Sequence, residues 1–417
     1  MLPKKLLKKV PVAWRWPLGV FFISVLAIHL WAGVVYKVYP LSVNSTVLCG
    51  KPTLLLFDLR NSDAFFYENQ VNGESLLFQA DSKGNLIDTQ SGSQWDPRTG
   101  RALSGKLEGQ KLIRSDVATE EIYPYKNVLP HTSPFLAIWQ RFDTNWYLKI
   151  AEKGYSDDDG STAFFPLYPF LVRFLSFIIG DMVLASRLVS LLALLFALFF
   201  FYQVVDGYAG EAVAKRALIY IVIFPSGFFL FASYTESLFL LLVLASFFCS
   251  RKQKWLIASL LGILAALTRA VGVLIFIPLF YIWYKQKRMH HWREAVVFFL
   301  LPLGAGIYLL PNMFSSLETE WRARPVFPWE HFVELKMLIS NDLLSSIDIF
   351  NMLITLLVGF LCLIMLKNLP LELSLYSLLM FGSPLFRLNA AQPFVSMLRY
   401  VLVIFPMFIF FGQWGEK

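Results

Sequence analysis

The sequence is poor in charged residues and in the side chains that most often bind metals or act as nucleophiles. Only 16% of its 417 residues are charged, and it has five histidines and three cysteines. The cysteines, Cys49, Cys249 and Cys362, are scattered and two lie in apolar runs, which gives no support to a disulfide framework or a thiolate metal site. No histidine pair has metal-ligand spacing, and neither a nucleophile triad motif nor a glycine-rich phosphate loop is visible.

Hydrophobic residues make up 57% of the chain, more than a water-soluble domain of this size carries. They recur in runs of about twenty residues, each long enough to cross a hydrocarbon core of roughly 30 Å as a helix. Open sheets do not survive in lipid, so we predict an all-α polytopic membrane protein of about ten transmembrane helices, with a small β-rich extracytoplasmic insert. The net charge of +8 falls in short Lys and Arg clusters between these runs, which indicates membrane topology and not nucleic-acid binding.

The basic clusters set the expected threading, because Lys and Arg concentrate on the cytoplasmic side. The basic N-terminal tail leads into an apolar anchor that is expected to stay uncleaved, so the long polar section that follows is expected outside. We expect a cytoplasmic tail and first span at 1–38, an extracytoplasmic β-rich insert at 39–135, an external loop with interfacial helices at 136–181, and a helical bundle at 182–417. Single spans are expected near 183–205, 215–233, 235–250, 294–312, 348–366, 371–386 and 398–413.

Two apolar stretches do not fit a single crossing. Residues 255–284 are too long for one comfortable span and have basic residues at both ends. Two short helices forming a hairpin keep both ends in the cytoplasm, and they place the only charge within the stretch, Arg269, near the outer surface. Residues 164–179 are apolar but short and contain two prolines and an arginine, so we expect a helix lying at the membrane interface.

The external section has a different texture between residues 46 and 125. Short alternating runs such as LLLFDL and ESLLFQA are interrupted by the turn-forming sequences NG, KGN, SGS and RTG. These are strand and turn signals and predict a β-rich fold. The string DTQSGSQWDPRTGRALSGKLEGQKL also partly resembles a domain of unknown function in bacterial and archaeal secreted proteins, which implies no particular chemistry.

The threading brings polar residues from separate segments to one outer face. They are Asp143, the run Asp157, Asp158 and Asp159, the segment from Ser233 to Glu236, Arg269, the pair Trp321 and Arg322, and the pair Arg399 and Tyr400. Arginines are disfavoured at outer span ends, where Arg187 is also expected, and a phosphate is a suitable partner because guanidinium donates two parallel hydrogen bonds to its oxygens. The alternatives are snorkelling to lipid headgroups or pairing with carboxylates.

The carboxylates have their own alternatives. Asp143 lies among aromatic residues before an interfacial segment, where a carboxylate suits a general base, but a solvated loop acid fits the sequence as well. The run from Asp157 to Asp159 suits a hard divalent cation, the only candidate cofactor, or a solvated turn. Ser233 and Glu236 match the S-x-x-E capping box at the start of an apolar helix, so we expect Glu236 to satisfy backbone donors there, with substrate contact as the alternative.

The strings RFDTNWYLKIAEKGY and AFFPLYPFLVRFLS resemble the signature of the GPI mannosyltransferase II (phosphatidylinositol-glycan class V) family and its prokaryotic relatives. SYTESLF, ALTRAVG and SMLRYVLVIFP follow in the matching order, so the resemblance covers about 136–417. It implies a GT-C glycosyltransferase fold with the catalytic acid in the first large external loop. The implied donor is a polyprenyl- or dolichyl-phosphate sugar, most often mannose, and the acceptor is a lipid or glycan hydroxyl.

By this resemblance Asp143 becomes the catalytic base of an inverting mannosyl transfer. Arg269, with Arg187 or Arg399, is expected to stabilise the departing lipid phosphate. Trp146, Tyr168 and Trp321 are expected to stack on the sugar or line the lipid entrance, and Glu236 and Arg322 to contact substrate.

Two other functions remain open on the sequence alone. A transporter or flippase of a lipid-linked saccharide also needs phosphate-binding arginines and a broken hairpin. A non-catalytic membrane scaffold presenting the insert to a partner is the other. The expected location is a multi-pass position in a membrane, with a prokaryotic cell membrane favoured over the endoplasmic reticulum and an extracytoplasmic active site.

Overall fold

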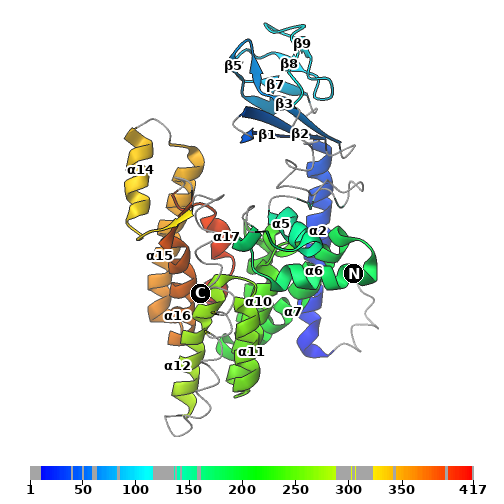
Figure 1. The fold of residues 1–417 in the computed structure, drawn as a ribbon. Coiled ribbons are helices and arrows are strands. Elements are labelled where there is room, and N and C mark those ends of the chain that lie inside the picture. Colours follow the sequence, from blue (N-terminus) through cyan, green and yellow to red (C-terminus); the bar gives the residue numbers. More distant parts are fainter. Residues whose placement is uncertain are drawn as a thin grey trace. The chain divides into compact units, whose positions relative to one another are not determined.

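The structure is a computed structural model that describes residues 11–38, 41–48, 51–58, 63–81, 85–115, 136, 139–140, 143–156, 161–287, 302, 306, 323–340, 344–389 and 393–415. The chain divides into two units (Figure 1). The helical unit comprises Met1–Ser24, Lys153–Ile178 and Ala185–Lys417, and the β-containing unit comprises Val25–Glu152 and Ile179–Leu184. The expected span near 294–312 lies outside the described residues apart from 302 and 306.

Most of the described chain is helical, as predicted. The α-helices are α2 (Val12–Val38), α5 (Asp143–Lys153), α6 (Leu167–Ile179), α7 (Met182–Ala209), α8 (Glu211–Ile223), α9 (Phe228–Phe231), α10 (Glu236–Arg251), α11 (Trp255–Ala266), α12 (Phe276–Lys287), α14 (Glu330–Ser340), α15 (Ser346–Asn368), α16 (Leu371–Gly382), α17 (Met397–Val401) and α18 (Phe405–Trp414). The 3-10 helices are η1 (Ser161–Ala163), η2 (Ala270–Ile275) and η3 (Ser383–Phe386).

Among the described residues, three helices are long and apolar enough to cross a membrane: Val12–Val34, Met182–Ala209 and Ser346–Asn368. Several shorter apolar helices accompany them, namely Leu167–Ile179, Trp255–Ala266, Ala270–Gln286 and Leu371–Phe386. In the helical unit, α10 packs on α11, and α16 packs on both α12 and α15 (Figure 1). Helix α8 packs on α18. The described chain is therefore compatible with a membrane protein.

Two stretches that were expected to be single spans, 215–233 and 398–413, are instead interrupted. In the first, α8 ends at Ile223 and the next residue, Phe224, is extended with ψ 143°. Pro225 explains this, because the ring of a proline disfavours helical geometry in the residue before it. In the second, α17 ends at Val401 and α18 begins at Phe405. Pro406 supplies no N–H and its ring clashes with the carbonyl four residues earlier, which favours a break in the helix at this point.

The predicted break in the 255–284 hairpin is confirmed. Helix α11 ends at Ala266, Arg269 is extended with φ −155° and ψ 135°, and η2 and α12 follow. Gly272 permits the close return of the chain, because a Cβ at this position would lie 2.5 Å from the backbone nitrogen of Ala266. Arg269 therefore lies at the apex of the interruption.

The β-containing unit carries antiparallel sheets, which confirms the strand and turn signals. Strands β1 (Leu41–Leu48), β2 (Lys51–Asp58) and β3 (Asp63–Glu68) form one sheet in that order. Strands β6 (Phe78–Ala80), β7 (Leu86–Asp88), β8 (Gln94–Trp95) and β9 (Ala102–Ser104) form a second, and β4 (Gln70–Val71) pairs with β5 (Glu74–Ser75). In the helical unit, β10 (Ala323–Pro325) pairs with β11 (Arg387–Asn389). The β4–β5 turn follows its NG signal, since Asn72 and Gly73 both have positive φ, 53° and 84°.

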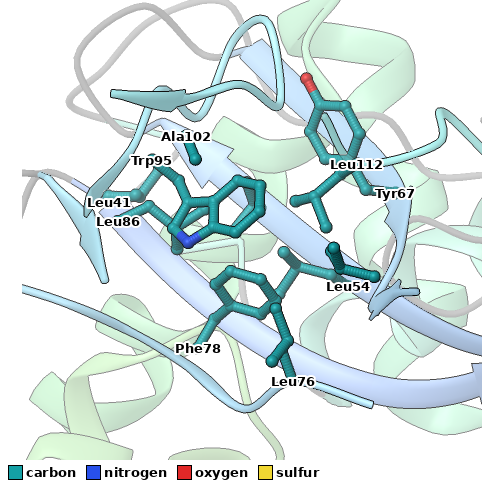
Figure 2. Close-up of a cluster of buried hydrophobic side chains, with 11 residues drawn as sticks. Leu41, Leu54, Tyr67, Leu76, Phe78, Leu86, Trp95, Ala102 and Leu112 are labelled. Carbon is teal, nitrogen blue, oxygen red and sulfur yellow. The ribbon is translucent and has the colours of Figure 1, made fainter. Parts of the chain in front are cut away.

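A hydrophobic cluster holds the sheets of the β-containing unit together (Figure 2). Leu54, Leu86 and Trp95 are almost wholly buried in it. The ring of Tyr67 packs beside Leu112, and its hydroxyl donates to the carbonyl oxygens of Pro97 and Arg98 at 3.1 and 2.7 Å. The β-containing unit thus has a core of its own.

Candidate functional site

Glu236 is the centre of a buried charge cluster in the helical unit. It is the first residue of α10, and its side chain has no exposed surface. Arg269 donates from Nη1 to Glu236 Oε1 at 2.8 Å, and Arg399 donates from Nε to the same oxygen. The side chains of Arg269 and Arg399 are 12% and 17% exposed, so both ion pairs lie largely out of solvent.

Aromatic rings surround the guanidinium groups. The guanidinium carbon of Arg269 lies 5.6 Å from the ring centre of Tyr400 and 5.9 Å from that of Phe239. That of Arg399 lies 4.6 Å from the ring centre of Tyr234. Cations at these distances from a ring face are attracted by its quadrupole. The rings and the carboxylate together hold the two guanidinium groups in place.

A hydrogen-bond network fixes the segment that precedes Glu236. The hydroxyl of Ser186, in the first turns of α7, donates to that of Ser233 at 2.9 Å. Ser190 donates to the carbonyl oxygen of Tyr234 at 3.2 Å, and the Tyr168 hydroxyl bonds to both Ser186 and Ser190. The start of α7 therefore lies beside the start of α10, and the ring under Arg399 is anchored through its own backbone.

Two further bonds bring the other segments to this end of the helical unit. The backbone N–H of Leu167, at the start of α6, donates to the carbonyl of Leu267 at 3.0 Å, two residues before Arg269. The hydroxyl of Ser226 donates to the carbonyl of Leu398 at 2.8 Å, next to Arg399. The expected gathering of Glu236, Arg269 and Arg399 from separate segments is thus present.

The two ion pairs of the cluster use one oxygen of Glu236, so that, among the described residues, two guanidinium groups share one carboxylate. The second oxygen of Glu236, Oε2, is buried and accepts no hydrogen bond from any described residue. Both arginines thus converge on one oxygen, and a buried site of this kind favours an anion beside the guanidinium groups.

The capping box expected at Ser233 and Glu236 is wrong. Helix α10 begins at Glu236 and not at Tyr234, and its N-cap, Thr235, makes no side-chain cap hydrogen bond. The carboxylate of Glu236 binds Arg269 and Arg399 instead. The hydroxyl of Ser233 accepts a hydrogen bond from Ser186. The alternative that arginines pair with a carboxylate holds for Arg269 and Arg399.

Tyr168 does not offer a ring for sugar stacking in this structure, which corrects that prediction. Its side chain is wholly buried and its hydroxyl is bonded within the network. Trp146, in α5, is also buried, and the ammonium group of Lys149 lies 5.3 Å from its ring centre. Both rings belong to the packing of their helices.

The remaining predicted site residues lie elsewhere in the described chain or outside it. Asp143 is the first residue of α5, in the β-containing unit, where a negative charge is favoured by the helix dipole. Arg187 is 3% exposed on α7, next to Ser186, and is not a partner of Glu236. Trp321, Arg322 and the run Asp157, Asp158 and Asp159 lie outside the described residues. Within the described ranges, no group of three acidic, His or Cys side chains forms a metal site.

Sequence reasoning missed the aromatic frame and the serine network. Phe239 stands three residues after Glu236, on the same helix face, and this spacing was a usable signal. Ser186 and Ser190 are likewise one helical turn apart. The ring of Phe229, whose centre lies 5.3 Å from the Arg399 guanidinium carbon, had no comparable signal.

Comparison of the chain with models of protein families, with curated proteins and with solved structures finds no match.

Proposed function

We propose that the chain is a membrane glycosyltransferase that moves a sugar, mannose in the first instance, from a polyprenyl-phosphate carrier to a hydroxyl of a lipid or glycan acceptor. The observation that carries the proposal is the pair of buried guanidinium groups held on one oxygen of Glu236. The proposal includes a GT-C bundle of about ten transmembrane helices, each long enough to cross the hydrocarbon core, and an extracytoplasmic active site.

A phosphate suits the cluster better than a neutral sugar does. Arginine donates paired hydrogen bonds in a fixed plane, which match the oxygens of a phosphate. Because Glu236 binds Nη1 of Arg269 and Nε of Arg399, it fixes the plane of each group before a ligand arrives. Preorganised donors of this kind stabilise charge that develops on a leaving phosphate without further rearrangement.

In the proposed reaction the acceptor hydroxyl attacks the anomeric carbon of the donor sugar. Asp143 takes the hydroxyl proton as the new carbon–oxygen bond forms. The bond between the anomeric carbon and the phosphate oxygen breaks with its electron pair on the oxygen, and the lipid phosphate leaves with its charge balanced by Arg269 and Arg399. A single displacement inverts the configuration of the anomeric carbon.

The test uses the full-length protein with radiolabelled polyprenyl-phosphate mannose and a panel of lipid and glycan acceptors. We expect transfer by the native protein and a loss of more than about a hundredfold in Arg269→Gln, the scale of losing one transition-state donor. Lys252→Gln is the matched control, because Lys252 is an exposed cation at the other end of α10. Full transfer by Arg269→Gln would overturn the role of the cluster.

Asp143→Asn separates the enzyme from a flippase. The variant should bind the donor, seen as a donor-dependent rise in melting temperature, yet transfer no sugar. Lipid-linked saccharide that crosses a vesicle membrane at the native rate in this variant, together with no transfer by the native protein, would favour the flippase instead.

A further inference from the structure

The side chain of His331, on α14, bridges two backbone segments inside the helical unit. The residue is only 2% exposed. Its Nδ1 lies 3.1 Å from the backbone nitrogen of Phe394, and its Nε2 lies 3.1 Å from the carbonyl oxygen of Leu385. The imidazole also stacks on the ring of Phe394, with 4.7 Å between the ring centres. His331 has no direct part in the proposed transfer reaction.

The two backbone partners fix the protonation state of this ring. A backbone N–H only donates, so Nδ1 accepts the bond from Phe394 and carries no proton. A carbonyl oxygen only accepts, so Nε2 carries the proton and donates it to Leu385. The imidazole is therefore neutral. A second proton, on Nδ1, would oppose one N–H to another and leave the buried amide of Phe394 without its acceptor, which is costly in a buried place.

The backbone that begins at Phe394 has an unfavourable conformation. Phe394 and Ser396 both have positive φ, 56° and 59°, in a region that residues other than glycine seldom adopt. Such residues keep this conformation only where the surrounding structure imposes it. Two contacts do so here: the ring of His331 accepts from the N–H of Phe394, and the hydroxyl of Ser226 donates to the carbonyl oxygen of Leu398.

This strained backbone leads directly to the buried charge cluster. The carbonyl oxygen of Ser396 accepts from the N–H of Arg399 at 2.9 Å, and the Arg399 guanidinium binds the shared oxygen of Glu236. The segment 394–399 is thus held by His331 at one end and by Glu236 at the other. A change at His331 therefore displaces the guanidinium of Arg399.

Charged groups on the adjoining elements influence when the ring takes up a second proton. Glu330 and Glu334 flank His331 on α14 and favour a cationic ring, because opposite charges attract. Arg387 on β11 and Arg399 on α17 oppose it, and so does burial. Histidine ordinarily changes its charge near about pH 6.5, so mildly acidic pH is the range in which the ring is to be tested.

We propose that His331 is a positioning residue: its neutral ring holds the segment 394–399 so that Arg399 meets Glu236, and protonation of the ring releases the segment. The stabilisation is present while the ring is neutral and is lost as the pH falls through the titration of the ring. The consequence for catalysis rests on the proposed function, in which Arg399 balances the charge of the leaving phosphate. The hold on the segment does not depend on it.

Hydrogen exchange of the full-length protein in neutral detergent tests the hold on the segment. After correction for the intrinsic exchange rate, we expect protection of the amides of 394–399 to be at least about tenfold lower at about pH 5.5 than at about pH 7.5. Amides of α8 should be equally protected at both pH values. His331→Gln keeps a donor and an acceptor but does not titrate, so protection should stay high. His331→Phe keeps the ring without its hydrogen bonds, so protection should be low throughout.

Transfer from radiolabelled polyprenyl-phosphate mannose gives a second readout. The kcat of the native protein should fall over the same pH interval, and His331→Gln should lose most of that fall. His331→Phe should have a kcat lower by about tenfold or more at both pH values, because a displaced catalytic group loses its alignment. His29→Gln is the matched control, since it removes a histidine on α2 and should keep the native pH dependence.

Two results would overturn the proposal: equal protection of 394–399 at the two pH values in the native protein, or the native pH dependence of exchange in His331→Gln. Melting curves show which variants fold, and if neither does, exchange of the native protein still decides. Protection that changes as expected in a native protein that transfers no sugar would overturn the transfer reaction and support the hold of His331 on the segment.

Discussion

Nη1 of Arg269 lies 2.8 Å from Oε1 of Glu236, an ion pair that joins the break of a helical hairpin to the first residue of another helix. Arg399 binds the same oxygen, so the carboxylate is the common anchor of two otherwise unconnected segments. Because all three side chains are largely buried, loss of the anchor leaves two cations in a poorly solvated place. The cluster therefore bears on stability as well as on ligand binding.

Glu236→Gln is expected to destabilise the helical unit by about 3–5 kcal/mol, the cost of removing one partner of a buried ion pair. The measurement is the melting temperature in neutral detergent without ligand. Glu211→Gln is the matched control, because Glu211 forms an ion pair with Lys215 that is exposed on the surface of α8, and its melting temperature should stay near that of the native protein. Equal melting temperatures for Glu236→Gln and the native protein would contradict the expected strength of the cluster.

Gly272→Ala is expected to lower the melting temperature because the added Cβ meets backbone. It would lie 2.5 Å from the Ala266 nitrogen, which cannot move without opening the hairpin, and forced contacts of this kind cost about 1–3 kcal/mol. Since Arg269 lies between these residues in the chain, the same change should weaken the stabilising effect of a polyprenyl-phosphate sugar. Gly382→Ala, where a Cβ meets nothing within 4 Å, should leave stability unchanged or slightly raised. If Gly272→Ala has the same melting temperature as the native protein, the prediction is wrong and the hairpin is packed less tightly at Gly272 than the 2.5 Å distance indicates.

Local chemistry made much of this architecture predictable. The Asn72–Gly73 pair predicted a two-residue turn because these residues tolerate positive φ. The length of the stretch 255–284, with basic residues at both ends, predicted the break at Arg269. The breaks before Pro225 and Pro406 were missed because hydropathy and basic clusters locate apolar runs and not the helix breaks within them, which proline geometry favours.

The partners of the charged side chains could not be predicted from local patterns. Ser233 and Glu236 fit a capping box, a local motif, whereas their actual partners, Ser186 and the two arginines, come from distant segments. Sequence spacing predicts which side chains are neighbours on one helix, whereas the packing of the whole unit decides which helices are in contact. The positive-inside rule predicted that Arg269 and Arg399 lie on the same side of the membrane, but it could not predict that both bind the same oxygen of Glu236.

Asp88 gives the insert a stability that depends on pH. Burial raises the pKa of its carboxyl. This effect is outweighed by hydrogen bonds from the side chains of Trp95 and Ser91 and from the backbone N–H groups of Ser91 and Ser93, so the net pKa lies below the ordinary value. The lowered pKa means that the stabilisation is present above the unfolded-state pKa, about 3.9, and is lost as the pH falls through the folded-state pKa.

We therefore expect hydrogen-exchange protection of the β7 and β8 amides in the full chain to be high at pH 6 and reduced at about pH 3. Asp88→Asn should lower protection at pH 6, since the bond from Trp95 Nε1 at 3.0 Å would lose its charged acceptor, and it should remove the difference between the two pH values. Glu74→Gln, on the exposed strand β5, is the control and should behave as the native protein. Equal pH dependence in Asp88→Asn would assign the effect to another group.

The proposed transfer reaction requires that Asp143 and Arg269 face the same side of the membrane, and single-cysteine labelling tests this. In a background without Cys49, Cys249 and Cys362, new cysteines replace Glu152 on α5 and Ala270 beside Arg269, both of which are exposed. We expect a membrane-impermeant maleimide to label both in intact cells. Lys252→Cys, at the other end of α10, should be labelled only after the membrane is opened. Since one helix separates Glu236 from Lys252, the third position calibrates the assay on the same bundle. Labelling of the Glu152 and Ala270 positions from opposite sides would place the base and the phosphate site in different compartments, and no single-displacement transfer joins them.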